Sequence, residues 1–288
     1  MLTVWEVLDL AEDGPYMTEK EFDLKVVARL CRELVREHDV RFDPERVVPD
    51  DDLADDVFEA GFRLALEAGM YCLSTNRVMK FSEDQLREAL ETAPSELTVG
   101  EGRDARLLYA RSVGDPRPPF VFGGAAGTPI PEEWFLQSAM SYAKEPLVDA
   151  IDHGSLAEVE GRRVKTRSPL EAHATRRELK MLREAIRRAG RPGMHLLAAE
   201  SSVTCLGDLA VASPEYLRPT DAHLVTIMNE LKTDYDQLTK VVNSAEYGAM
   251  SATLPDPIIG GYAGGPEGVA VDMVASFILG RAAYQAHY

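Results

Sequence analysis

The stretch Gly260-Gly261-Tyr262-Ala263-Gly264-Gly265-Pro266-Glu267 sets two glycine pairs around a tyrosine, directly before an expected helix. An apolar segment, residues 257–259, precedes it, so an extended segment meets a helix through a loop with few side chains. Glycine tolerates positive φ and lets other groups approach the backbone closely. Such loops bind ligands at the carboxyl ends of strands in α/β proteins. A tight strand-to-helix turn without a ligand has the same pattern, so both interpretations stay open.

Three earlier segments repeat this strand-loop-helix order. Short apolar runs over 119–123, 147–152, 194–199 and 250–254 predict four strands, and helical patterns follow them. Strands that alternate with helices indicate right-handed βαβ units, so we expect a parallel sheet with the four strands adjacent in sequential order. The longest intervening section, 220–247, is predicted to be helical. No glycine fingerprint of the open-sheet nucleotide folds occurs, which favours a (β/α)8-type barrel over a doubly wound sheet.

The first 117 residues differ in character, because helical patterns dominate them. Thr18-Glu19-Lys20-Glu21 and Ser82-Glu83-Asp84-Gln85 are capping-box patterns at helix starts, and Gly69 is expected to end another helix. Residues 116–119 then break the pattern with three prolines. We therefore predict a mainly helical region over 1–117 and a barrel domain of about four βα units over 118–288.

Composition excludes several functional classes. The formal net charge of −17 argues against nucleic-acid binding, which needs a basic surface. Cys31, Cys72 and Cys205 are odd in number and have no metal-ligand spacing, which indicates a reducing compartment. No signal-peptide pattern opens the sequence, and its most apolar stretch is too short to span a bilayer. We expect a cytoplasmic protein with no membrane partner.

Few residues on the expected strand-end loops carry chemistry. Glu200 follows the third strand, where partial burial would raise its pKa and suit a general acid or base; it would equally serve as a helix N-cap. His153 follows the second strand and is either a site residue or a loop hydrogen-bonding group. Tyr262 lies in the glycine loop. His195, inside an apolar strand, is expected to be a core histidine.

Seven stretches spread in order along the chain carry a resemblance to a known family: Thr18–Leu24, Val57–Phe62, Gly100–Ala105, Arg111–Asp115, Ala189–Met194, Asn229–Asp234 and Gly260–Gly265. Through them the sequence resembles the monomethylamine:corrinoid methyltransferases of methanogens, a TIM-barrel family whose active site carries pyrrolysine. It implies a barrel of which only about the first four βα units lie within this chain, because family members are considerably longer.

The resemblance also implies roles for individual positions. Leu197 matches the pyrrolysine, Leu254 matches a carboxylate that flanks it, and Glu200 matches a glutamate that the family retains. Leucine has no electrophilic carbon with which to bind an amine. We expect Leu197 to face away from the helices. The predicted site is therefore catalytic Glu200, Leu197 and His153, with substrate-binding Gly260, Gly261, Tyr262, Gly264, Gly265 and Leu254, and no metal ligand.

Two functions follow from the resemblance. One is a pyrrolysine-independent methyltransferase that moves a methyl group from a methylated amine, or from a quaternary ammonium compound, to a corrinoid. The corrinoid would be carried by a partner protein, and the chain itself would bind no cofactor directly. The other is a non-catalytic relative that keeps the fold and partner docking. A half barrel has two open strand edges, and open edges recruit partners, so we expect a homo-oligomer.

Overall fold

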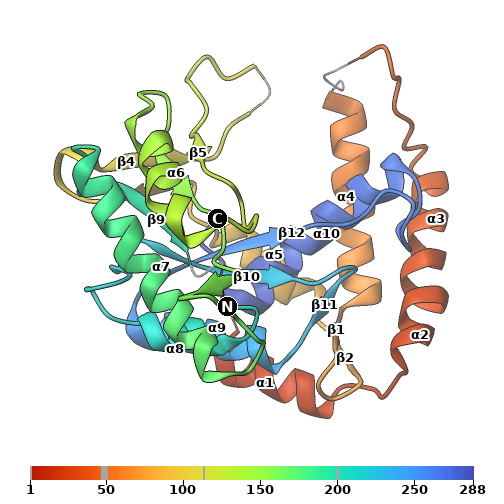
Figure 1. The fold of residues 1–288 in the computed structure, drawn as a ribbon. Helices are drawn as coiled ribbons and strands as arrows, with labels where there is room; N and C mark the ends of the chain where they lie inside the picture. The colour runs from red at the N-terminus through yellow and green to blue at the C-terminus, as the bar shows by residue number, and fades with distance from the viewer. Residues whose placement is uncertain (1, 47–50, 113, 199–200) are drawn as a thin grey trace. The chain divides into compact units, whose positions relative to one another are not determined.

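Five strands form the largest sheet in a computed structural model of the chain, which describes residues 2–46, 51–112, 114–198 and 201–288 (Figure 1). They are β5 (Phe122–Gly123), β6 (Ala150–Asp152), β9 (His195–Ala198), β10 (Ala222–Ile227) and β12 (Met250–Pro255), in the order β12-β10-β9-β6-β5. The pairs β5–β6, β6–β9 and β9–β10 are parallel. The predicted α/β fold with a parallel sheet is confirmed. The (β/α)8-type barrel stays a prediction.

The helical prediction for residues 220–247 is wrong in its first part. Ala222–Ile227 forms β10, which lies between β9 and β12 in the sheet, so the third and fourth predicted strands are not neighbours. Its sequence AHLVTI contains β-branched residues and is mostly buried, as suits a strand inside a sheet. A short strand, β11 (Lys232–Thr233), follows, and the helix α9 spans only Tyr235–Tyr247.

The chain folds into two compact units, each built from segments that are distant in the sequence. Unit 1 comprises Met1–Ala93, Val225–Leu238 and Thr253–Ala286, and unit 2 comprises Pro94–Leu224, Thr239–Ala252 and His287–Tyr288. The division at residue 117 expected from the sequence stays a prediction. Within unit 1, the C-terminal helix α10 (Pro266–Tyr284) packs on N-terminal helices. Linear sequence order does not reveal such a long-range pairing.

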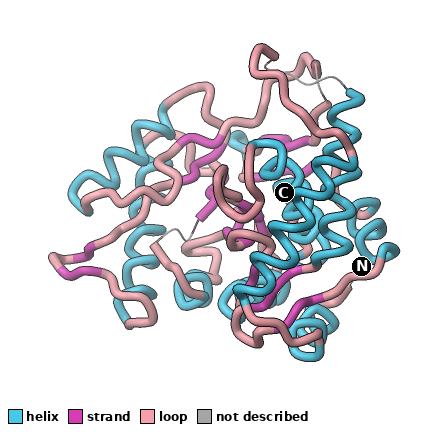
Figure 2. The backbone as a smooth tube through the Cα atoms, turned by 90° about the vertical axis from the view of Figure 1, so that its right-hand side faces the viewer, coloured by secondary structure: helices cyan, strands magenta, loops and turns pink. Residues whose placement is uncertain are grey.

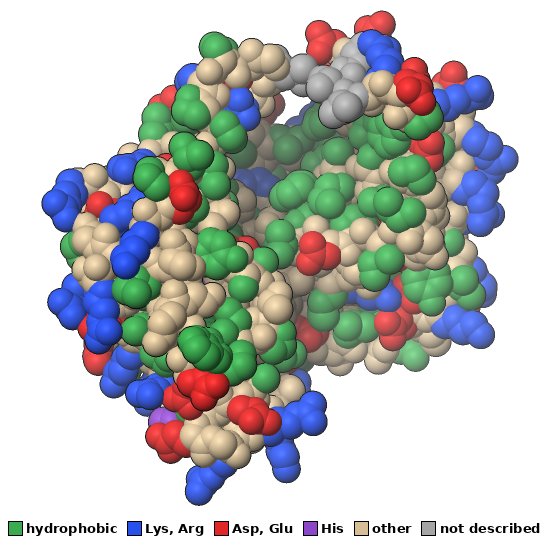
Figure 3. All heavy atoms as spheres, turned by 45° about the horizontal axis from the view of Figure 1, so that its top comes forward, with side chains coloured by type: hydrophobic (Ala, Val, Ile, Leu, Met, Phe, Trp, Pro, Cys, Tyr) green, Lys and Arg blue, Asp and Glu red, His purple; other side chains and the backbone are tan. Residues whose placement is uncertain are grey.

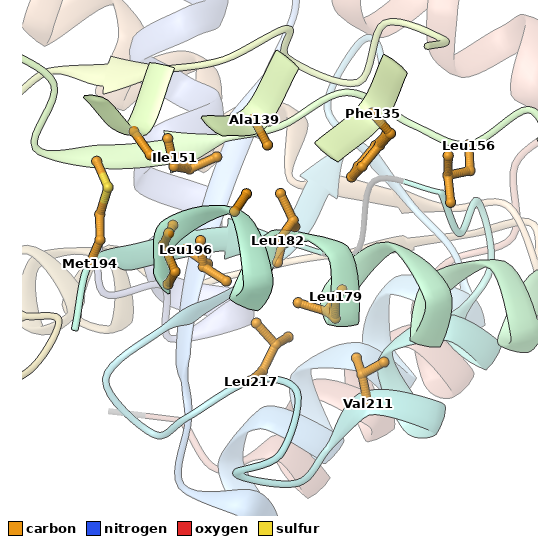
Figure 4. Close-up of a cluster of buried hydrophobic side chains, with 14 of the residues drawn as sticks. Phe135, Ala139, Ile151, Leu156, Leu179, Leu182, Met194, Leu196, Val211 and Leu217 are labelled. Carbon is orange, nitrogen blue, oxygen red and sulfur yellow. The ribbon is translucent and has the colours of Figure 1, made fainter. Parts of the chain in front are cut away.

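In unit 2, helices pack on one face of the strands. The elements of this unit besides the sheet are β3 (Glu96–Val99), η2 (Gly102–Asp104), β4 (Arg106–Tyr109), α6 (Glu132–Lys144), β7 (Glu158–Val159), β8 (Arg162–Arg163), α7 (Pro169–Arg188) and α8 (Cys205–Val211). Figure 4 shows side chains of α6, α7 and α8 converging on those of β6 and β9, with Leu182 near Leu196. Ile151, Leu196 and Ala198 therefore point toward the helices.

Unit 1 combines helices with a small sheet of order β11-β1-β2. Its elements are α1 (Val4–Asp13), α2 (Glu19–Glu21), the π-helical segment η1 (Phe22–Val27), α3 (Ala28–Glu37), α4 (Asp51–Ala68), β1 (Met70–Cys72), β2 (Arg77–Met79), α5 (Glu83–Glu91), β11 and α10. The capping boxes predicted at Thr18 and Ser82 are confirmed. α4 ends just before Gly69, whose φ is 68°. In the backbone view, helices are longer than the strands (Figure 2).

Charged side chains of both signs cover the surface drawn in Figure 3, interspersed with hydrophobic ones, and neither sign forms one continuous patch on this face. Exposed large hydrophobic residues include Trp134, Leu147 and Val203 in unit 2 and Ile258 and Ile259 in unit 1. Among the helices of the described ranges, none is both long enough and apolar enough to cross a membrane.

Gly61 sets how closely α4 and α10 pack within unit 1. A Cβ atom at this glycine would lie 2.5 Å from the Cβ of Val274 and 3.0 Å from the carbonyl oxygen of Val271. Both neighbours belong to α10, and a backbone oxygen cannot move aside cheaply. The two helices therefore approach each other at a point where only glycine fits.

We predict that Gly61→Ala lowers the free energy of unfolding by about 1 to 2 kcal/mol, because overpacking outweighs the helix propensity gained. Urea denaturation measures the change. Glu59→Ala, on an exposed position of the same helix, is the control and should stay within about 0.5 kcal/mol of the parent. A Gly61→Ala variant at least as stable as the parent would contradict this packing.

Candidate active site

Strand register brings the candidate residues of unit 2 into rows. Asp152 of β6 pairs with Leu197 of β9, and Leu197 pairs with Ala222 of β10. Partners in register share one face of a sheet, and successive residues alternate between faces. These three side chains therefore lie on the face opposite Ile151 and Leu196. We call it the Leu197 face; the preceding row on it contains Phe122, Ala150 and His195.

Leu197 packs in an apolar cluster on this face. It is 7% exposed and lies with Ala222 and Ala252, against which Phe122, Leu224, Met250 and Tyr288 also pack. The side chain points away from α6 and α7, as expected from the sequence. Its surroundings are apolar, and the catalytic role of position 197 stays a prediction.

Asp152 is a functional candidate that the sequence analysis missed. Its carboxylate is half-buried, and burial raises its pKa to about 6. Within the described residues, Oδ1 is buried and has no hydrogen-bond partner. A buried carboxylate oxygen without a donor is costly. The alternation of β6 could have identified Asp152, because it places this residue, and not His153, on the same face as Leu197.

The glycine-rich loop after β5 braces the backbone at Asp152. The Ala126 N–H donates to the carbonyl oxygen of Asp152 at 3.3 Å, and the Gly127 N–H donates to that of His153 at 2.8 Å. A Cβ at Gly124 would lie 1.6 Å from the Asp152 carbonyl oxygen. Glycine is thus required for the loop to approach β6 this closely, which fixes the strand end that presents the carboxylate.

His195 and Tyr288 form a buried pair beside this row. His195 Nδ1 lies 2.7 Å from the Thr220 carbonyl oxygen, and Nε2 lies 2.7 Å from the Tyr288 hydroxyl. A carbonyl only accepts, so Nδ1 carries the proton and Nε2 accepts from the tyrosine. Burial lowers the pKa of His195 and raises that of Tyr288. The Tyr288 ring stacks on Phe122 at 6.0 Å between centroids. The expected core role of His195 is confirmed.

His153 lies on the opposite face from Leu197, toward the helices. Its ring is buried 6.1 Å from that of Phe135 on α6, and its Nε2 is 3.2 Å from Oε1 of Glu178 on α7. Burial lowers the pKa of His153 to about 4. This placement separates it from Leu197 and Asp152, and it favours the structural alternative over a catalytic role.

Glu200, the predicted acid or base, lies outside the described residues. The segment that follows it is held by two carboxylates of α7. Glu178 accepts a hydrogen bond from the Ser201 N–H at 2.9 Å, and Glu171 accepts from the Thr204 N–H at 2.7 Å and from the Ser202 hydroxyl at 3.1 Å. Burial would raise the pKa of Glu171, but these bonds lower it overall. Residues 201–204 are thus held by hydrogen bonds to two carboxylates of the neighbouring helix.

In unit 1, the glycine loop surrounds a carboxylate of the chain itself. Glu230 is buried, and its Oε2 accepts from the Tyr262 N–H at 3.1 Å. A Cβ at Gly261 would lie 2.6 Å from the other carboxylate oxygen. Gly260 and Gly264 have φ of 89° and 92° and close the turn through a 2.7 Å backbone bond. The loop therefore binds an internal anion, which favours the structural alternative for these glycines.

A buried ion pair lies beside Glu230. Lys232 Nζ is 2.7 Å from Asp23 and 2.9 Å from Glu19, and it sits 5.9 Å from the ring centre of Tyr262. Burial would lower the pKa of Lys232, but the two carboxylates raise it overall. Asp23 lies in the π-helical segment η1. Such segments are frequent at functional sites.

Tyr262 and its loop border a groove of about 360 Å³ in unit 1, whose other wall is α3. Its lining is Ala28, Cys31, Arg32, Val35, Arg36, Gly261–Gly265, Glu267 and Gly268. The other substrate-binding residue predicted in this unit, Leu254, is 42% exposed on β12. The predicted site residues thus belong to two units: Leu197 and His153 to unit 2, the glycine loop and Leu254 to unit 1.

Asp272, another residue that the sequence analysis missed, is a buried acid of α10. Its Oδ2 has no hydrogen-bond partner in the described part of the chain. Burial and the nearby Glu230 raise the pKa of Asp272 to about 7. Burial also raises the pKa of Glu230. The Cys31 thiol is buried too, and its pKa is raised by burial and by these acids. No local sequence pattern marks this cluster.

Comparisons with known proteins point to one family. A family described as monomethylamine methyltransferase MtmB matches residues 2–288. MtmB2 of Methanosarcina acetivorans is 37% identical over 277 residues, and the MtmB of Methanosarcina mazei is 36% identical over the same length. The crystal structure of the Methanosarcina barkeri MtmB aligns over 99% of this chain and 62% of that one, with a TM-score of 0.94 and 34% identity.

The alignments cover nearly all of this chain but only part of each relative. The alignments to MtmB2 and to the MtmB of Methanosarcina mazei cover 95% of this chain and 60% of each relative. A structure described as the hydroxylamine MtmB complex aligns over the same 62% of its own chain, again with a TM-score of 0.94. This chain thus spans about 60% of the length of the curated relatives that it matches.

We predict that Asp272→Asn alters the pH dependence of stability. Folded Asp272 keeps its proton up to about pH 7, whereas the unfolded residue loses it near its ordinary pKa of 3.8. Its contribution to stability therefore falls as pH rises through this window. The variant should match the parent at about pH 4 and exceed it by on the order of 2 to 4 kcal/mol at about pH 8.

Chemical denaturation at several pH values measures this difference. Asp55→Asn, at an exposed position of α4, is the control for the loss of one acidic side chain and should leave the pH profile unchanged. Parallel profiles for the parent and Asp272→Asn would contradict the raised pKa, because they would show that Asp272 has the same pKa in the folded and the unfolded chain.

Proposed function

Because this chain belongs to the monomethylamine methyltransferase MtmB family, we propose that it takes part in moving a methyl group from a methylated amine to a corrinoid. The observation that carries the proposal is the family match over residues 2–288. The corrinoid would be presented by a partner protein. The chain spans about 60% of the length of the relatives that it matches, so the activity of the whole relatives enters here only as a proposal.

We propose that the sheet of unit 2 is part of a (β/α)8-type barrel and that its Leu197 face lines the reaction site. The parallel pairs β5–β6, β6–β9 and β9–β10 support this, because neighbouring strands of such barrels are parallel. The apolar cluster around Leu197 also supports it. No three His, Cys, Asp or Glu residues in the described ranges lie together as metal ligands, and a corrinoid brings its cobalt already held by the corrin ring.

In this proposal, the corrinoid and the side chains of this chain have different roles. The corrinoid, when presented, supplies the reduced cobalt that accepts the methyl group. This chain's side chains bind the amine, orient one methyl group outward and exclude water. Leu197, Ala222 and Phe122 offer methyl-sized apolar contacts but no electrophile and no hydrogen-bond donor. They therefore cannot form a covalent adduct with an amine.

These contacts favour a pyrrolysine-independent reaction. The resemblance to the family puts leucine at position 197 in place of pyrrolysine. A quaternary ammonium substrate needs no covalent activation, because its nitrogen keeps the electron pair of the broken N–C bond and leaves as a neutral amine. Monomethylamine must be protonated before its nitrogen can leave as a neutral amine, and leucine at position 197 offers no group that activates it. The proposed substrate is therefore a quaternary ammonium compound.

A second function is favoured by a separate observation. Leucine stands at both positions, 197 and 254, where the resemblance implies pyrrolysine and a flanking carboxylate. A chain that has lost both groups could retain the fold and the docking of the corrinoid protein without catalysis. The two functions differ in one measurable property, the formation of methylated corrinoid.

We predict that the purified 288-residue protein methylates cob(I)alamin from tetramethylammonium or glycine betaine and gives no product from monomethylamine. The reason is that a quaternary nitrogen leaves as a neutral amine without prior protonation, whereas monomethylamine must first be protonated or activated by a covalent adduct. Absorbance spectroscopy follows the loss of cob(I)alamin. Leu197→Asp, which puts a charge in the apolar cluster, should abolish the reaction, and Leu147→Asp, on an exposed position, should not.

Product from monomethylamine would contradict the account of Leu197. No product from any of the compounds would favour the non-catalytic function, provided that the protein is folded by circular dichroism. The same reaction with free cob(I)alamin and no protein gives the background rate.

A further inference from the structure

Asp152 differs from every other acid of unit 2 that the structure describes around the sheet. Asp221 is paired with Arg183 and Arg218, Glu171 is hydrogen-bonded by the Ser202–Thr204 segment, and Glu178 contacts His153. Asp152 has no ion pair in the described chain, and its buried Oδ1 has no hydrogen-bond donor. Among the described residues, no side chain therefore balances its charge.

The surroundings of Asp152 specify what would balance it. Its register partner is Leu197, followed by Ala222, and these side chains offer no hydrogen bond. Phe122 and Tyr288 stack on the same face, and the Asp152 charge contributes to the raised pKa of the Tyr288 hydroxyl. Carboxylate, aliphatic and aromatic groups together match a cation that carries methyl groups. An inorganic cation would lack the further oxygen ligands that it requires.

We propose that the Asp152 carboxylate binds the positively charged nitrogen of a methylated ammonium ion, with Leu197 and the Phe122–Tyr288 pair contacting its methyl groups. The inference rests on the proposed function, because it names the residue that recognises the substrate class suggested there. In this proposal, Asp152 attracts the positive charge of the ligand, because the uncharged side chain of Leu197 cannot.

The brace behind Asp152 supports a binding role. The Ala126 and Gly127 N–H groups fix the backbone at residues 152 and 153, and Gly124 permits the close approach. A carboxylate held on a fixed strand end loses little conformational entropy when a ligand binds. The charged and titratable groups that face it are also defined: His195 has a lowered pKa and Tyr288 a raised one, so both are neutral near pH 7.

Calorimetric titration of the 288-residue protein with tetramethylammonium chloride tests the proposal. Salt concentration is matched with sodium chloride, and tert-butanol serves as an uncharged compound of similar size. We expect the parent to bind tetramethylammonium and Asp152→Asn to bind it at least about tenfold more weakly, as removal of a close opposite charge would require. Glu133→Gln, at an exposed acid of α6, should bind like the parent.

A second measurement, an NMR titration, is made on the parent protein itself. The carbon-13 shift of the Asp152 carboxyl reports its titration, and a bound cation should lower its pKa from the value of about 6 in the free protein. Affinity should likewise fall about tenfold between about pH 8 and about pH 5, because the carboxylate becomes protonated. The variant is needed only to assign the carboxyl signal.

The outcomes separate this inference from the proposed function. Equal affinity of the parent and Asp152→Asn, no binding by the parent, or an unchanged Asp152 titration would each overturn the inference. Methyl transfer from a quaternary ammonium compound that persists in Asp152→Asn would leave the proposed function intact while removing Asp152 from it. Binding that depends on Asp152 without methyl transfer would support the inference and favour the non-catalytic function.

Discussion

The register between β6, β9 and β10 is the constraint on which the rest of the candidate site depends. It places Asp152, Leu197 and Ala222 in one row, because partners in parallel strands share a face. A slip of one residue would bring Leu196 and Ala198 to that face and turn Leu197 toward the helices. The helices prevent this, since Leu196 and Ala198 fill the core beneath α6 and α7. Packing on one face therefore determines chemistry on the other.

Buried carboxylates have two distinct roles in this chain. Some are satisfied by the backbone and fix loops, as Glu171 does for residues 202–204 and Glu230 does for the glycine loop. Others, Asp152 and Asp272, keep an oxygen without a donor among the described residues and have raised pKa values. Carboxylates of the first kind accept hydrogen bonds from loop N–H groups, so these loops resemble ligand sites although they bind a side chain of the protein. The second kind is where a ligand or a proton would be expected to bind.

Local patterns in the sequence predicted what depends on local physics. The capping boxes at Thr18 and Ser82, the end of α4 at Gly69 and the strands of the parallel sheet follow from hydrogen-bonding and periodicity over a few residues. β10 was missed because its six residues precede a true helix and were merged with it. Asp152 was overlooked beside His153, although strict alternation would have distinguished their faces. Glu230 and Asp272 depend on contacts between distant segments, which no local pattern contains. The roles suggested for Leu197 and Glu200 came from resemblance and stay predictions.

Nuclear Overhauser contacts from the methyl groups of Leu196 and Leu197 test the central claim most directly, because they report which face each residue occupies. The account predicts contacts from Leu197 to the methyl groups of Ala222 and Ala252, and from Leu196 to the core residues of α7, such as Leu182. The exchanged pattern, with Leu197 against Leu182 and Leu196 against Ala222, would contradict the register and with it the assignment of Asp152 and Leu197 to one site.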